Sequence, residues 1–255
     1  MKYPTIRIMK GFVLVLTACV LLAEVNSAKL PDYLKKCKKG PEGAKCVIDN
    51  GLAAVSSLTK DGEPKFKLQS LTPIHVDKID LQATPQLKVV LDDVDFTGFE
   101  GLSLTDGKID DNELTFKAHL NRMELVGKYD INGRILILPI QGKGTCNITM
   151  VNLDFNYKTK LFTEERKGKK YFRVESNENT VGEINNIKRV YWQFDNLFNG
   201  DERLGPEMNR FLNENWKDVY GEVKTAIEQT AAYSIFNYFI NGYLHFVPID
   251  EMFEE

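Results

Sequence analysis

The chain has 255 residues, of which 43% are hydrophobic, 27% are charged and 11% are aromatic, and its formal net charge is −3. This content of aromatic and aliphatic residues is enough to fill a core, which excludes a disordered chain. A sequence pI near 5.8 argues against a nucleic-acid-binding protein, because such a protein needs a basic surface to neutralise phosphates.

The first 27 residues have the composition of a secretory signal peptide. Three basic residues precede 13 uncharged residues at positions 11–23, and a small residue, Ser27, follows at the expected cleavage point. Thirteen residues are too few to span a bilayer core, which needs about 20. We therefore expect residues 1–27 to be removed, and residues 28–255 to form one secreted, extracellular domain without stable membrane insertion. Its net charge is −5, since three positive charges and one negative charge leave with the signal peptide.

Three cysteines remain in the mature chain. Cys37 and Cys46 are nine positions apart, with two Gly and a Pro between them, and in an oxidising compartment they can close a short disulfide loop worth roughly 2–3 kcal/mol. A metal site is the weaker alternative, because no His or further Cys lies near at ligand spacing. Cys146 has no evident partner and is expected as a small buried hydrophobe.

Alternation of apolar and polar residues indicates strands over residues 66–198. Asn132-Gly133 predicts a hairpin turn, because both central positions of a type I′ turn require positive φ. In that register Tyr129 lies opposite Leu136. The parity predicts one inward face, which carries Met123, Leu125, Tyr129, Leu136, Leu138, Ile140, Cys146, Ile148 and Met150.

The same parity places Asn147 on the outer face. Asn147-Ile-Thr149 is a glycosylation sequon, and a glycan must point to solvent. After Met150 the apolar parity changes, which predicts a β-bulge near positions 150–151 within a long strand over about residues 145–163. Lys167-Gly-Lys169 predicts a second hairpin turn, and residues 191–194 a later strand.

Near the C-terminus the apolar period changes to steps of three and four, which predicts a helix over residues 206–241 with a possible kink at Gly221. Such a helix is about 54 Å long, whereas a compact chain of this size is only about 45 Å across. The sequence therefore predicts a single elongated α+β domain, in which a strongly curved antiparallel sheet wraps one long helix.

The sequence contains no recognisable constellation for catalysis. Its three His show no metalloprotease motif, and no Gly-x-Ser-x-Gly elbow is present. A calcium-like loop begins at Asp93 but has Leu104 at its twelfth position, where the bidentate carboxylate is needed. We expect no enzyme activity, no metal and no cofactor.

Five segments together resemble the insect takeout and juvenile-hormone-binding protein family over the whole mature chain. Each motif alone is modest, but their order is specific. Because the hormone-binding branch carries a second disulfide and Cys146 has no partner here, the takeout branch is the closer one. The segments are LPDYL at 30–34 followed by Cys37 and Cys46, GKYDINGRILILPIQGKG at 127–144, FDNLFNG at 194–200, FLNENW at 211–216 and FVPIDEMF at 246–253.

The resemblance implies a lipid-binding, TULIP-like fold with a hydrophobic tunnel between sheet and helix. It implies a carrier of a small hydrophobic ligand, such as a terpenoid hormone, a fatty acyl chain or a quinone. With the predicted register, the expected tunnel lining comprises Tyr129, Leu136, Leu138, Ile148, Met150, Val223, Ile227 and Ile235. The alternatives are a secreted signalling or immune module that docks on an unknown receptor or a lipid surface, and, less favoured, a hydrolase.

Overall fold

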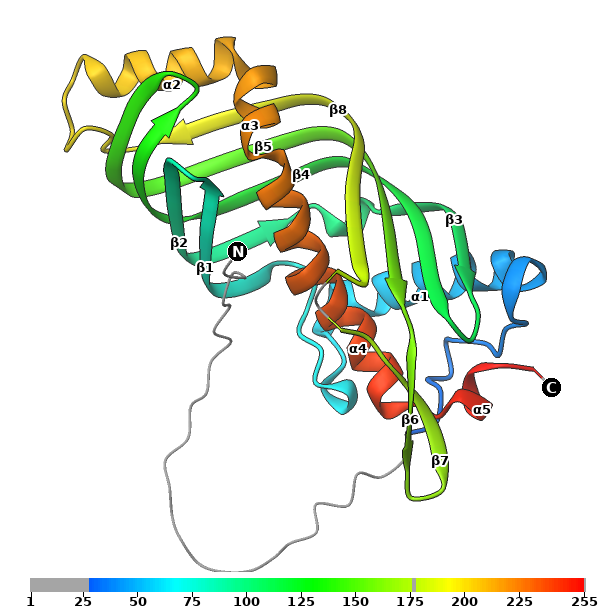
Figure 1. Ribbon diagram of the computed structural model, residues 1–255. Helices are drawn as coiled ribbons and strands as arrows, with labels where there is room; N and C mark the ends of the chain where they lie inside the picture. The colour runs from blue at the N-terminus through cyan, green and yellow to red at the C-terminus, as the bar shows by residue number, and fades with distance from the viewer. Residues whose placement is uncertain (1–27, 176–177, 255) are drawn as a thin grey trace, which may run out of the picture.

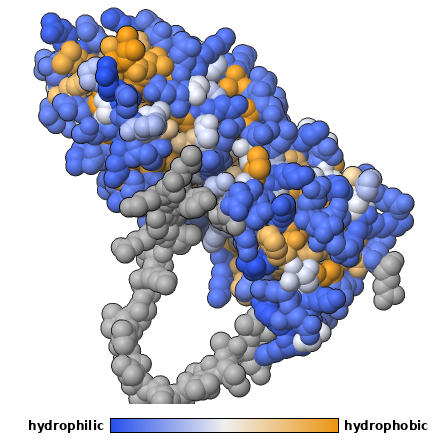
Figure 2. All heavy atoms as spheres, viewed as in Figure 1, coloured by the Kyte–Doolittle hydropathy of each residue, from blue (hydrophilic) through white to orange (hydrophobic). Residues whose placement is uncertain are grey.

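The computed structural model describes residues 28–175 and 178–254, so the expected signal peptide lies outside the described residues. A curved antiparallel sheet embraces a helical arm, defined here as residues 204–246 (Figure 1). The polar residues of the visible face surround separate hydrophobic patches (Figure 2). The strands are β1 (Ile74–Thr84), β2 (Leu87–Thr97), β3 (Ser103–Ile109), β4 (Glu113–Ile135), β5 (Leu138–Lys160), β6 (Phe162–Arg166), β7 (Lys169–Arg173) and β8 (Thr180–Phe194).

The helices lie at both ends of the chain. Before the sheet come η1 (Gly40–Gly43), α1 (Ala44–Asp61) and η2 (Pro64–Phe66), and η3 (Phe99–Gly101) links β2 to β3. The arm consists of α2 (Leu204–Glu214), α3 (Trp216–Thr230), the π-helical segment η4 (Ala231–Phe236) and α4 (Asn237–Phe246), and it is followed by α5 (Ile249–Met252).

The sheet has the order β1-β2-β4-β5-β8, and β3 pairs with the first half of β4. β4 and β5 contain 23 residues each, and every pair across them is antiparallel in one continuous register. β6 and β7 form a separate hairpin whose turn lies at positions 167–168, as predicted. The curved sheet and the long C-terminal helical arm confirm the predicted fold class.

The predicted Asn132-Gly133 turn is wrong. Ile135 pairs with Leu138, so the chain reverses at Leu136 and Ile137 instead. Gly133 has φ 144° and lies against the neighbouring strand, where an added Cβ would sit 2.0 Å from the carbonyl oxygen of Gln86. The glycine therefore serves a close approach between strands, while Leu136 takes the left-handed conformation of the turn with φ 54°.

The error shifts the register by an even number of residues, so it leaves the predicted inward parity intact. Tyr129 pairs with Gly144 rather than with Leu136. Cys146, Ile148 and Met150 are buried, as the parity predicted.

The change of parity in β5 occurs near the predicted position. Met150 and Leu153 are both buried, and Asn152 between them has φ 49°. The pairing with β4 keeps its register here, and the shift instead lies between Asp154 and Phe155 on the side of β8. The predicted bulge is therefore displaced by a few residues.

The arm is not one continuous helix. It breaks at Asn215, whose side-chain amide donates to the carbonyl oxygen of Phe211 at 2.9 Å, and it passes through the π-helical segment before α4. Gly221, the expected kink, lies inside α3. Helix α1 was not predicted, although Val47, Gly51 and residues 54–58 repeat at helical spacing.

Asparagine side chains attach the helices to neighbouring extended backbone. Asn213 accepts from the Trp192 amide at 3.0 Å and donates to the Trp192 carbonyl at 2.6 Å. Asn209 pairs in the same way with both backbone groups of Phe194, at 2.9 and 2.8 Å. Because the two asparagines are one helical turn apart, they match the spacing of alternate residues on the free edge of β8.

We expect Asn213→Ala to lower the free energy of unfolding by about 1–3 kcal/mol, because both backbone groups of Trp192 lose their partner. Urea unfolding measures the change. Glu214→Ala, on the exposed side of the same helix, is the control and should stay within about 0.5 kcal/mol of the parent. Equal effects of the two substitutions would contradict this role of the amide.

Candidate functional site

A cavity of about 170 Å³ lies between the sheet and the first part of the arm. Its wall is built from the inward positions of β1, β2, β4, β5 and β8 and from one side of α3. Representative apolar members are Ile79, Leu91, Met123, Ile140, Ile148, Met150, Phe155, Trp192, Val223 and Ile227.

A second cavity, of about 250 Å³, lies beneath α1. The other walls come from β3, the first half of β4 and α4. Its members include Val47, Ile48, Val55, Leu58, Leu104, Leu114, Phe116, Phe239, Ile240 and Tyr243. Phe99 and Phe236 line both cavities.

Polar side chains in these walls are few, and two of them, Glu228 and Tyr243, make hydrogen bonds. Glu228 accepts a hydrogen bond from the Ile184 amide and thereby covers part of the β8 edge. The hydroxyl of Tyr243 lies 3.0 Å from that of Tyr33, and burial raises the pKa of Tyr243, so this phenol stays neutral. The walls of both cavities can therefore bury an apolar molecule away from water. They contain few groups that could act as an acid or a base.

The structure brings four of the eight predicted lining residues to the first cavity. Ile148 and Met150 reach it from β5, and Val223 and Ile227 reach it from α3. Their role in ligand binding stays a prediction.

Three of the other predicted lining residues lie outside both cavity walls. Tyr129 is buried and donates to the Asp195 carbonyl at 2.7 Å, and burial raises its pKa to about 12. Leu136 and Leu138 are half-buried at the β4–β5 turn. The side chain of Ile235 lies outside the described ones.

The prediction missed the whole second cavity and the contribution of β1 and β2 to the first. Two signals were available in the sequence. Ile79 and Leu81, followed by Val89 and Leu91, alternate as strand positions do, and the residues of α1 repeat at helical spacing. No local pattern indicates that a space remains between elements so distant in the chain.

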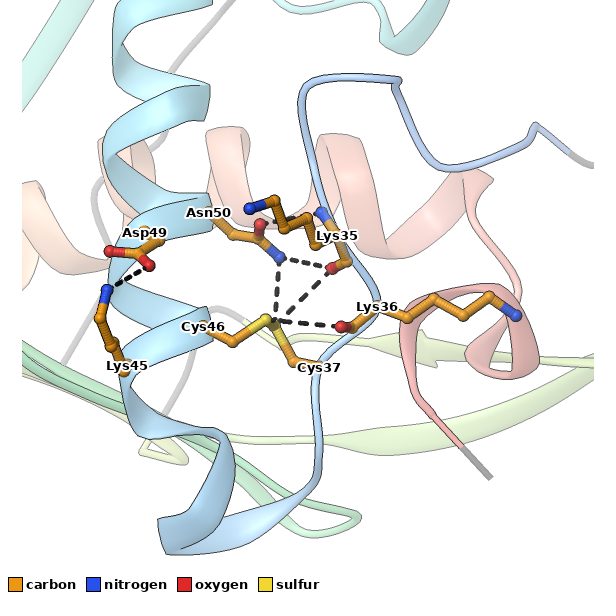
Figure 3. The surroundings of a disulfide bond; sticks show 7 residues. All are labelled: Lys35, Lys36, Cys37, Lys45, Cys46, Asp49 and Asn50. Carbon is orange, nitrogen blue, oxygen red and sulfur yellow. Dashed lines mark hydrogen bonds and ion pairs between the residues drawn. A yellow bond between two sulfur atoms is a disulfide. The ribbon is translucent and has the colours of Figure 1, made fainter.

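The predicted disulfide is confirmed, with Cys37 bonded to Cys46 and their Cα atoms 5.6 Å apart. Figure 3 shows how the disulfide joins the N-terminal segment to the first turn of α1. One turn further along α1, Asn50 bonds both backbone groups of Lys35, at 2.9 and 2.7 Å. On its other side Cys37 exchanges backbone hydrogen bonds with the C-terminal residues, accepting from Glu254 and donating to Met252. One residue therefore connects the wall helix of the second cavity to the end of the chain.

The sequon lies on the outer face, as the register predicted. Asn147 is half-buried and its amide donates to Glu124, away from both cavities. Its glycosylation stays a prediction.

Two histidines make hydrogen bonds to aspartates outside the cavity walls. His119 Nδ1 lies 2.7 Å from Asp154, and His75 Nδ1 lies 2.8 Å from Asp95. Hydrogen bonding to these carboxylates raises the pKa of both imidazoles. Neither histidine lies at a cavity wall. Among residues 28–175 and 178–254, no group of three His, Cys, Asp or Glu is arranged to hold a metal.

Comparisons with known proteins agree with this architecture. A family model described as haemolymph juvenile hormone binding protein matches residues 13–254. The circadian clock-controlled protein daywake of Drosophila melanogaster is 23% identical over 244 residues, which cover 90% of each chain. The crystal structure of Takeout 1 from Epiphyas postvittana superposes with a TM-score of 0.71 at 25% identity, over 87% of this chain and 100% of that one. In the described part of the chain, no helix has the length and apolarity needed to cross a membrane.

We expect Cys146 to resist iodoacetamide at pH 8 in the folded protein. Cys146 is only 3% exposed as a residue, and burial raises the pKa of its thiol to about 11, so both access and the thiolate fraction are low. Mass spectrometry after a timed reaction should show alkylation only when urea is added. Rapid labelling without urea would contradict the buried position.

Proposed function

The chain belongs to the haemolymph juvenile hormone binding protein family, and on that premise we propose that it is a secreted carrier of a small hydrophobic ligand. The observation that carries the proposal is the pair of apolar cavities between sheet and arm. Protein interiors are normally close-packed, so unfilled apolar space of this size favours a binding role over a purely structural one.

Burial against these apolar walls can supply the binding free energy for such a ligand. Burial of about 400 Å² of apolar ligand surface gives about 10 kcal/mol before the loss of translational freedom is subtracted, which leaves micromolar to nanomolar affinity. The ligand classes that fit are terpenoids, fatty acyl chains and quinones. Organic extraction of the purified protein, followed by mass spectrometry, would identify the occupant.

Secretion is supported by the composition of residues 1–27 and by the disulfide, because disulfides persist in oxidising compartments. The outward position of Asn147 supports a glycan there.

Expression of the full chain in insect cells should release a product that begins at Ala28 or Lys29 and carries a glycan on Asn147. Peptide mapping identifies the first residue, and glycosidase treatment should lower the mass. Asn147→Gln is the control and should show no such change. Retention of residues 1–27 in a cell-bound product would contradict secretion.

We expect Val223→Trp to weaken binding of the apolar dye N-phenyl-1-naphthylamine at least tenfold, because the larger side chain enters the first cavity. The melting temperature should change little, since the indole occupies existing space. In a filled core the same enlargement would cost about 1–3 kcal/mol. Dye titration and thermal melting on the same variant distinguish the two cases.

Leu138→Trp is the matched control, because Leu138 lies at the β4–β5 turn and not at the cavity wall. It should leave dye binding unchanged. A fall in stability for Val223→Trp, with no dye bound by the parent protein, would contradict the carrier function.

A further inference from the structure

The two cavities follow one another along the arm. The first uses arm residues up to Ala231, and the second uses arm residues from Phe239 onward. Phe236 lies between these groups and lines both cavities. The arm therefore passes from one cavity to the other at a single side chain.

On the sheet, too, the lining residues pass from one cavity to the other at the level of Phe236. Along β4, Phe116 lines the second cavity and Leu120 lines the first. Between β2 and β3 the boundary falls at Phe99, the other side chain that lines both. Phe99 and Phe236 thus bound the two cavities from the sheet side and from the arm.

Aromatic rings from both cavities hold Phe236 in place. Phe155, at the wall of the first cavity, stacks on it with ring centroids 5.2 Å apart. Phe116, at the wall of the second, meets it edge-on at 5.8 Å, and Tyr157 packs at 5.5 Å. Such paired rings stabilise one another beyond simple burial, so Phe236 is a fixed obstacle and not a loose side chain.

The π-helical segment explains why this residue reaches the boundary. Phe236 is nine positions after Ile227, which is about two and a half turns of an α-helix, so an uninterrupted helix would point it away from the side of Ile227. A π turn, with its i→i+5 hydrogen bonds, contains one more residue than an α-helical turn. The side chains that follow it are therefore rotated about the helix axis, back towards the side of Ile227. With η4 in the arm, Phe236 lines the same cavity as Ile227.

We infer that Phe236 is a partition that sets the length of the ligand, so that each cavity alone accepts only a short apolar chain. The inference rests on the proposed carrier function and concerns the specificity of that same interior. A longer chain has to displace the ring from its stacked contact with Phe155 and its edge-on contact with Phe116 before it can occupy both cavities.

Competition of straight-chain alcohols of 8–18 carbons against N-phenyl-1-naphthylamine tests the partition. The parent protein should bind decanol at least tenfold more tightly than octadecanol. In Phe236→Ala the affinity for octadecanol should rise at least tenfold, while that for decanol should change less than threefold. Phe211→Ala is the matched control, because it removes the same ring from the arm at a position outside both cavity walls and should leave octadecanol binding unchanged.

Circular dichroism and thermal melting establish that each variant is folded. If Phe236→Ala does not fold, Phe99→Ala opens the same boundary from the sheet side and carries the same expectation. Equal affinity of the parent protein for both alcohols, or a folded variant with unchanged octadecanol binding, would overturn the partition while the carrier function stands. Failure of every alcohol and of the dye to bind the parent protein would overturn both.

Discussion

A helix cannot pair its own backbone with the edge of a sheet, because its amide and carbonyl groups are used internally. In this protein asparagine side chains supply the missing pairing, since each carboxamide offers one acceptor and two donors. Asn209 and Asn213 hold α2 against β8, and Asn241 in α4 bonds both backbone groups of Val174 at 3.0 and 3.2 Å. Asn50 does the same for the segment before the disulfide.

The asparagine side chains that make these attachments do not themselves line either cavity. The asparagines therefore fix the arm although it is not closely packed against the sheet along its whole length. Most helix–sheet interfaces need such close packing. The apolar space between arm and sheet is a consequence of this division between attachment and lining. One stacked and two edge-on aromatic contacts around Phe236 then join the arm to the sheet in the middle of the interior.

The inward face of the long strands could be predicted because side chains alternate with a period of two, and a register error of eight residues does not change which face they occupy. The position of the turn could not, since Asn132-Gly133 has the local chemistry of a turn but lies where three strands meet. The place of Phe236 at both cavity walls could not be predicted either, because it depends on the π-helical segment, which the helical spacing of apolar residues does not indicate. The cavities themselves are spaces left between distant elements, and no sequence period encodes them.

The order of the elements along the chain has a consequence for biosynthesis. All strands are complete at Phe194, and the arm follows only at Leu204. At about 5–20 residues per second, the 52 residues from the end of β8 to the end of the arm at Phe246 take roughly 3–10 s to synthesise. Helix α1 precedes the sheet and can already cover the second cavity, but the wall of the first cavity is covered only by the arm. During that interval the nascent protein therefore presents the wall of the first cavity as open apolar surface. Chaperones, neighbouring nascent chains and apolar small molecules all compete for that surface before the arm arrives.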